Sequence, residues 1–260
     1  MSQLAVLVVG ATGSIGRHVV QKCLQAGHAT RALVRNPARA DLPAGVEVVV
    51  GDLTDPASLA AAVDGVDAVV FTHGSDGGGK VGARTVDYGG VHQVLTALGD
   101  QPARIALMTA IGTTVRNTSY NQSTESHDWK RRAERLVRAS GRDYTIVRPA
   151  WFDYNADDQL AITLLQGDTR RSGTPADGAI ARRQIAKVLV DSLTSEAANH
   201  KTFELVAETG PEPDDLDPLF AALDADEPDA IDSVHDIDNQ PWDDEPEQVR
   251  AELEVLRRPR

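Results

Sequence analysis

The chain has 260 residues, of which 41% are hydrophobic, enough for one large or two modest domains with a packed core. Its net charge of −13 lies in residues 211–260, which hold 17 acidic and 4 basic residues, whereas residues 1–210 hold 22 of each. Neither part has the basic excess typical of nucleic-acid-binding proteins. The single cysteine, Cys23, excludes an internal disulfide framework, and no apolar run approaches the ~20 residues that span a bilayer. The first apolar run is too short for a signal peptide. We therefore expect a cytoplasmic protein with no nucleic-acid or membrane partner and no metal site.

A short apolar run at residues 4–9 predicts a strand that is buried on both faces. Glycines follow at positions 10, 13 and 16, and the apolar spacing then becomes helical. Such a turn presents backbone N–H groups and the positive end of a helix to an anion, so a pyrophosphate can bind there. A glycine-rich turn that binds nothing is the alternative. The first interpretation predicts these cofactor-binding residues: Gly10, Thr12, Gly13, Ser14, Ile15 and Gly16.

The end of the second predicted strand, residues 29–35, distinguishes between the two dinucleotides. A site for NAD(H) usually has an acidic residue here, which binds the ribose 2′-hydroxyl. This chain has no acidic residue between Leu24 and Ala40, and Arg35 stands at the strand end. A guanidinium binds a 2′-phosphate, whereas a carboxylate repels it. We expect NADP(H) rather than NAD(H), with Arg35 and Asn36 at the cofactor; a solvated Arg35 is the alternative.

The next two strands, predicted at residues 46–50 and 67–73, each end in candidate cofactor contacts. After the first, Asp52 can accept a hydrogen bond from an adenine amino group, with Leu53 against the ring. After the second, residues 74–81 nearly match a P-loop, but Val81 replaces the Ser or Thr that binds magnesium. We interpret this loop as a flexible cover near the nicotinamide.

Further strands are predicted at residues 103–109 and 143–148, and the alternation with helices predicts a doubly wound parallel α/β sheet. Ligands of such sheets bind at the carboxyl ends of the strands. We expect a loop over residues 115–124, a helix over 129–140 and a strand pair over 162–173. A helix over 181–193 and a strand over 203–206 follow. The residues expected on one rim are Gly10, Arg35, Asp52, His73, Thr109 and Pro149.

The chain resembles the short-chain dehydrogenase/reductase superfamily, in its atypical NAD(P)-binding branch. The resemblance covers residues 3–208 and implies a Rossmann domain over residues 1–208 that includes a small substrate-side lobe. It rests on residues 10–16, 33–37, 51–55, 86–88, 140–149, 180–186 and 202–205. It also implies cofactor contacts by His73, Gly74, Thr109, Lys130, Pro149 and Ala150.

Active members of the superfamily pair a tyrosine with a lysine four residues later; the lysine holds the nicotinamide ribose and the tyrosine transfers a proton. Lys130 matches that lysine, but Ser126 stands at the tyrosine position. His127 is a neighbouring proton donor, although a helix directs it elsewhere, and Tyr120 reaches in only if its loop folds back. The hydroxyl that polarises the substrate is expected from Thr109, with Thr113 and Thr114 as alternatives. We therefore predict Lys130, Thr109 and His127 as catalytic residues.

Two aromatic residues, Trp151 and Phe152, follow Pro149 at the sheet rim. They are expected either to line a pocket for a flat substrate or to pack in the core under a long loop. The first hypothesis for function is an NADP(H)-dependent oxidoreductase that acts on a small aromatic or quinone-like acceptor. The second is a non-catalytic NADP(H) sensor that binds a protein partner. A homodimer is a possible assembly.

Residues 209–260 form an acidic extension with two expected helices, over residues 214–223 and 245–257. Both have apolar residues on one side, and the second has Pro246 at its start, acidic residues early and basic residues late, which suits the helix dipole. A disordered tail would not need these apolar stripes. We expect the extension to pack either on its own chain or on a partner subunit.

Overall fold

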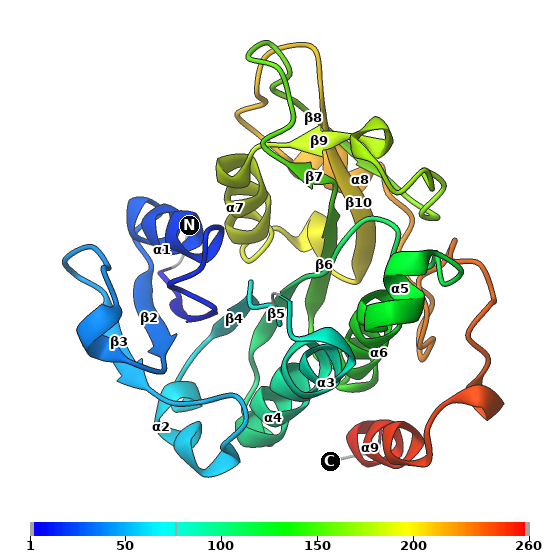
Figure 1. The fold of residues 1–260 in the computed structure, drawn as a ribbon. Coiled ribbons are helices and arrows are strands. Elements are labelled where there is room, and N and C mark those ends of the chain that lie inside the picture. The colour runs from blue at the N-terminus through cyan, green and yellow to red at the C-terminus, as the bar shows by residue number, and fades with distance from the viewer. Residues whose placement is uncertain (1–2, 76, 258–260) are drawn as a thin grey trace.

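The computed structural model describes residues 3–75 and 77–257 and confirms a doubly wound α/β fold (Figure 1). Its central sheet has the strand order β3-β2-β1-β4-β5-β6-β10-β8, in which β8 pairs antiparallel with β10 and the other pairs are parallel. The strands are β1 (Ala5–Val9), β2 (Ala29–Val34), β3 (Glu47–Val50), β4 (Ala68–Phe71), β5 (Arg104–Met108), β6 (Tyr144–Pro149), β8 (Ala161–Leu165) and β10 (Lys201–Glu208).

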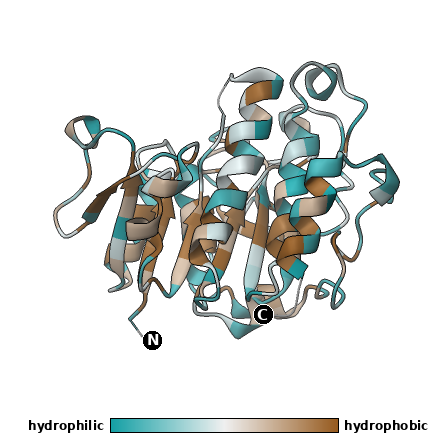
Figure 2. Cartoon of the chain, turned by 90° about the horizontal axis from the view of Figure 1, so that it is seen from below, coloured by the Kyte–Doolittle hydropathy of each residue, from teal (hydrophilic) through white to brown (hydrophobic). Residues whose placement is uncertain are grey.

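Helices cover both faces of this sheet, and each face has its own hydrophobic core. Helices α1 (Gly16–Gln25), α7 (Arg182–Asp191) and α8 (Asp217–Ala221) lie on one face. On the other lie α2 (Ala60–Val63), α4 (Gly89–Leu98), α6 (Ser126–Ala139) and α9 (Glu247–Arg257). Figure 2 shows the hydrophobic colour concentrated on the central strands, as expected of parallel strands covered on both faces.

Short elements connect these layers. Strands β7 (Trp151–Phe152) and β9 (Ala179–Ile180) form a separate parallel pair, in which β7 closely follows the end of β6. Helix α3 (Gly79–Gly82) continues into a π-helical segment, Ala83–Tyr88, which leads into α4. The 3₁₀ turns are Pro37–Arg39, Pro56–Ser58, Pro175–Asp177, Glu196–Ala198 and Trp242–Asp244. None of the helices in the described residues is long and apolar enough to cross a membrane.

Two of the expected local elements are wrong. Residues 115–124 are not all loop, because α5 (Ser119–Thr124) forms there with the side chain of Thr118 accepting a hydrogen bond from the Asn121 N–H at 3.1 Å. Helix α5 is almost entirely polar, so its sequence lacks the apolar spacing from which a helix is predicted. The strand pair over residues 162–173 is a single strand, β8, because β10 provides its partner. After β8 the chain turns away at Gly167 and Asp168, both at positive φ.

The acidic extension packs on its own chain. The apolar residues of α9, Val249, Leu253 and Leu256, are buried in the same core as α4 and α6. Upstream, Leu216 and Phe220 of the α8 region are buried in the core on the opposite face. The extension therefore wraps around the sheet edge and contributes to both hydrophobic cores (Figure 1).

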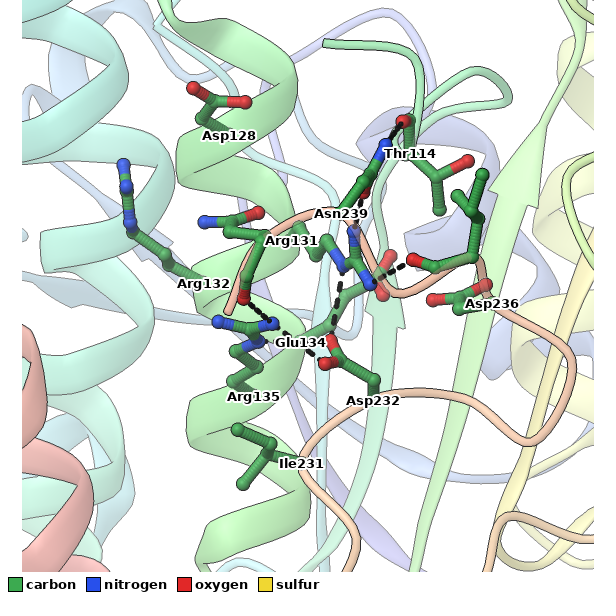
Figure 3. Close-up of polar contacts among 12 residues, drawn as sticks. Thr114, Asp128, Arg131, Arg132, Glu134, Arg135, Ile231, Asp232, Asp236 and Asn239 are labelled. Atoms are coloured by element: carbon green, nitrogen blue, oxygen red, sulfur yellow. Dashed lines mark hydrogen bonds and ion pairs between the residues drawn. The ribbon is translucent and has the colours of Figure 1, made fainter. Parts of the chain in front are cut away.

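Between those two anchors, the extension supplies carboxylates to a row of buried arginines on α6 and β6. Figure 3 shows part of this row, with Asp232 beside Arg131 and Arg135 of α6. The side chains of these arginines are 0–7% exposed, and an unpaired buried charge of this kind is strongly destabilising. The ion pairs are Arg131–Asp232 at 3.0 Å, Arg135–Asp232 at 2.6 Å, Arg132–Glu245 at 2.6 Å, Arg138–Asp226 at 3.0 Å, Arg148–Asp236 at 2.7 Å and Arg135–Glu245.

Candidate functional site

The turn between β1 and α1 requires glycine at two of its three glycine positions. Gly10 has a φ of +89°, and a Cβ there would lie 2.6 Å from the backbone nitrogen of His73. A Cβ on Gly16 would lie 2.0 Å from the carbonyl oxygen of Gly10. The Gly13 N–H donates to that same carbonyl at 2.9 Å, which closes the turn. Thr12, Gly13 and Ser14 are exposed, so a phosphate can approach their backbone.

The adenosine side of the candidate site lies at the carboxyl ends of β2 and β3. Arg35 and Asn36 follow β2 and are both exposed, and the Asn36 side chain accepts a hydrogen bond from the Ala38 N–H at 3.1 Å. Asp52 follows β3 and accepts hydrogen bonds from the N–H and hydroxyl of Thr54 at 2.8 and 2.7 Å. These bonds lower the pKa of Asp52, and the positive charge of Arg35 adds to the effect. Leu53 is partly buried against the core.

On the nicotinamide side, Lys130 forms an ion pair with Asp87 at 3.2 Å. Asp87 lies on the π-helical segment, and such segments often occur at functional sites. Its buried carboxylate also accepts hydrogen bonds from the N–H and hydroxyl of Ser75 at 3.0 and 2.7 Å. Asp87 therefore ties the loop after β4 to α6. Sequence reasoning missed this role, since nothing local shows that residues 87 and 130 meet.

His73 lies between the glycine turn and this ion pair. Burial lowers the pKa of His73 to about 4, so its imidazole is neutral near pH 7. Its Nε2 is 3.0 Å from the carbonyl oxygen of Val86, an arrangement that assigns the hydrogen to Nε2 and leaves Nδ1 as an acceptor. Nδ1 is buried and has no hydrogen-bond partner among the described residues. Gly74, beside it, is exposed.

Thr109, predicted to polarise a substrate carbonyl, directs its hydroxyl elsewhere. It is buried and donates to Glu134 at 2.7 Å. The alternatives are also engaged, because the Thr114 hydroxyl donates to Asp168 at 2.8 Å and the Thr113 hydroxyl donates to the carbonyl oxygen of Ala110. The structure therefore gives all three hydroxyls a structural acceptor.

His127 stands on the first turn of α6. Its Nδ1 is 3.3 Å from the carbonyl oxygen of Val115, and its ring centroid is 5.5 Å from that of Tyr120. Burial lowers the pKa of His127, which favours the neutral ring. Ser126, at the position of the superfamily's tyrosine, is itself buried.

The aromatic cluster after β6 divides between surface and core. Pro149 and Ala150 are buried, and the Ala150 N–H donates to the carbonyl oxygen of Leu205 at 2.9 Å. Trp151 is 37% exposed and meets the exposed ring of Tyr154 edge-on at 6.0 Å. Phe152 packs against the core instead. Phe152 therefore agrees with the alternative of packing in the core, whereas a pocket for a flat substrate at Trp151 stays a prediction.

The family is identified by a comparison with family models, in which residues 10–196 match the family described as NAD(P)H-binding. The chain belongs to this family. The match includes the glycine turn, the Asp87–Lys130 pair and the aromatic cluster. The resemblance to the atypical short-chain dehydrogenase/reductase branch is therefore confirmed, and the chain contains an NAD(P)H-binding domain.

Two curated relatives show how far the similarity extends. Photosystem II assembly factor Ycf39 of Cyanophora paradoxa is 29% identical over 211 residues, which cover 78% of this chain and 63% of that protein. The chain thus spans less than two thirds of that relative's length. The uncharacterized sugar epimerase YhfK of Bacillus subtilis (strain 168) is 29% identical over 210 residues, which cover 78% of this chain and 94% of YhfK.

Three solved structures share the fold at 17–24% identity. A putative NAD-dependent epimerase/dehydratase from Bacillus halodurans has a TM-score of 0.66 and 24% identity, and covers 85% of this chain and 100% of its own. A short-chain dehydrogenase/reductase from Veillonella parvula, solved with NADP, has a TM-score of 0.55 and 17% identity, and the match covers 82% of this chain and 100% of that chain. The anaerobilin reductase ChuY from Escherichia coli O157:H7 has a TM-score of 0.62 and 22% identity over 81% and 98%.

Proposed function

We propose that the protein is an NADP(H)-dependent oxidoreductase that reduces a small aromatic or quinone-like acceptor. The observation that carries the cofactor preference is the exposed Arg35 at the end of β2, close enough to lower the pKa of Asp52, in a stretch with no acidic residue. The glycine turn fits a pyrophosphate, and the buried acceptor Nδ1 of His73 lies on the same rim. The Veillonella structure shows that this fold binds NADP in one relative.

The aromatic acceptor is supported by Trp151 and Tyr154, whose exposed rings stand at the carboxyl end of β6. Flat aromatic ligands pack well against such rings. ChuY, which shares the fold, is named as an anaerobilin reductase, which agrees with a reductase activity for this fold.

The bound cofactor would supply the hydride. Lys130, which pairs with Asp87 at 3.2 Å, would bind a ribose hydroxyl and keep the nicotinamide fixed. A quinone needs little acid assistance to accept hydride, so the absent tyrosine matters less than it would for an aldehyde. His73 and His127 are both favoured as neutral rings, and the proton is therefore expected from water.

The test compares NADPH and NADH binding by fluorescence titration. Arg35→Ala should weaken NADPH binding about 10- to 100-fold, because a charged hydrogen bond to phosphate is lost, and should leave NADH binding unchanged. Arg39→Ala is the matched control, since Arg39 is exposed in the same connection. Equal affinity for the two dinucleotides, or no effect of Arg35→Ala, would refute the NADP(H) preference.

A second function, a non-catalytic NADP(H) sensor, is favoured by the buried Ser126 at the tyrosine position and by the engaged threonine hydroxyls. NADPH oxidation with a panel of quinones and aldehydes separates the two. Turnover with a quinone supports the oxidoreductase. Tight NADPH binding without turnover on any acceptor supports the sensor.

A further inference from the structure

We propose that Arg182, which pairs with Asp153 beside the glycine turn, is a ligand of the cofactor's pyrophosphate. The inference rests on the proposed dinucleotide site and adds to it a cation that lies about 170 residues from the turn in the chain. It also links that site to the segment that carries the aromatic cluster.

The first observation is a direct contact between Arg182 and the turn. Arg182 is the first residue of α7, and its Nε donates to the hydroxyl of Ser14 at 3.2 Å. Ser14 lies between Gly13 and Gly16, where the exposed backbone is suited to an anion. Helices α1 and α7 pack side by side on one face of the sheet, which brings the two residues together (Figure 1).

The second observation is the state of the guanidinium. Its Nη1 forms an ion pair with Asp153, and the Arg182 N–H donates to the other oxygen of that carboxylate at 3.0 Å. Nη2 donates to no group in the described residues, and the side chain is 32% exposed. The guanidinium is thus held on one edge by Asp153 and, among the described residues, keeps Nη2 as a free donor on another. A planar guanidinium of this kind is suited to binding two neighbouring phosphate oxygens.

The other basic residues near the turn are less suited to this role. Arg17 donates to the carbonyl oxygen of Thr12 at 3.1 Å and pairs with Asp41 at 3.5 Å. Arg183, the next residue of α7, pairs with Glu212 at 2.8 Å. Arg182 is the one of these three that contacts a side chain between the turn glycines.

The same guanidinium lies over the ring of Phe152, at 5.4 Å from its centroid. Phe152 and Asp153 follow Trp151, so one side chain contacts both the phosphate turn and the aromatic segment. A pyrophosphate on the turn would share the guanidinium with Asp153, and the position of the aromatic segment would then depend on cofactor binding.

The test is the dissociation constant of NADPH and of NADH for Arg182→Ala and for Arg183→Ala, the adjacent control. A pyrophosphate contact is common to both dinucleotides, so Arg182→Ala should weaken both by a similar factor, about 10- to 100-fold. The loss should shrink as salt is raised, since ionic strength screens exposed charges. Arg183→Ala should leave both constants within about twofold, as expected for an exposed ion pair. Arg182→Gln, which keeps most of the side chain, replaces the alanine variant if that variant melts early.

Asp153→Ala separates a cofactor contact from a merely structural role. If Arg182 served only to hold the aromatic segment, removal of Asp153 would weaken binding as much as removal of Arg182. We expect Asp153→Ala to keep or increase the affinity instead, because a competing anion is lost. An equal loss for the two variants, or unchanged binding in Arg182→Ala, would overturn the proposal.

The outcomes also separate this proposal from the proposed function. A protein that binds NADPH and NADH equally, yet loses both in Arg182→Ala, contradicts the NADP(H) preference and supports the role of Arg182. A protein that prefers NADPH but whose binding is unchanged by Arg182→Ala supports the NADP(H) preference and contradicts the role of Arg182. A protein that binds neither dinucleotide contradicts both.

Discussion

The carboxylate of Glu245 accepts a hydrogen bond of 2.6 Å from Nε of Arg132, across 113 residues of chain. Arg135 binds the other oxygen of the same carboxylate, and all three side chains are buried. Glu245 of the acidic extension is therefore a counter-charge for arginines of α6, as Asp232 is for Arg131 and Arg135 (Figure 3). A homodimer that used this face of α6 would have to displace the extension.

This pairing predicts that Glu245→Ala is strongly destabilising. Removal of the carboxylate deprives the buried guanidiniums of Arg132 and Arg135 of this counter-ion, and breaking a buried ion pair typically costs about 3–5 kcal/mol. Glu254→Ala, at an exposed position of α9, should stay within about 0.5 kcal/mol of the parent protein. Urea denaturation measures both, and similar midpoints for the two variants would contradict the structural role of Glu245.

The apolar contact of α9 can be tested separately from the charges. Leu253 is fully buried in the core shared with α6, and Leu253→Ala should lower the free energy of unfolding by about 2–5 kcal/mol. Val255, two residues on, is 57% exposed, so Val255→Ala should have little effect. A thermal melt compares the two. If Leu253→Ala melts with the parent protein, α9 is not docked in solution as it is in the structure.

The glycine turn and the parallel strands could be predicted from the sequence because their signals are local: Gly10 and Gly16 stand next to the elements they connect. The pairing of Arg132 with Glu245 could not, since a run of arginines on a helix ordinarily indicates a solvated face. Their burial depends on acidic residues about a hundred positions away. Lys130 was predicted from a motif, but its partner Asp87 depends on how the π-helical segment packs against α6.

The buried ion-pair network also predicts a pH dependence of stability. Burial raises the pKa of Glu204 to about 7, although Arg148 lies 3.2 Å away and opposes the shift. The unfolded value is about 4.3, so between these values the folded chain binds the extra proton. The contribution of Glu204 to the free energy of unfolding is therefore largest at low pH and falls as pH rises through 7.

Glu204→Gln removes this contribution and keeps an oxygen that can accept the Asp168 N–H, which donates to Glu204 at 3.0 Å. From pH 5 to pH 8, the variant should gain stability relative to the parent protein, by an amount on the order of a few kcal/mol. Burial also lowers the pKa of His73, so the folded protein loses stability as the pH falls below about 6.5. Parent and variant both contain His73, so this effect cancels in the difference between their stabilities. Glu208→Gln, exposed at the end of the same strand, is the control. Parallel stability profiles for parent and Glu204→Gln would show that Glu204 is ionised throughout.

The ion pair between Lys130 and Asp87 predicts how the cofactor end of the site responds to mutation. Lys130→Met keeps the length of the side chain and removes the charge, so it should weaken NADPH binding about tenfold, the effect of one lost hydrogen bond to a charged group. Asp87→Asn should give a smaller loss, because Lys130 remains but is less firmly held. Lys80→Met is the control, since Lys80 is exposed and pairs at 2.9 Å with Glu125, the residue between α5 and α6. Fluorescence titration gives the three constants, and the order Lys130, Asp87, Lys80 is the expected ranking of losses. A loss for Lys80→Met as large as that for Lys130→Met would mean that net charge, and not a contact with the ribose, governs binding.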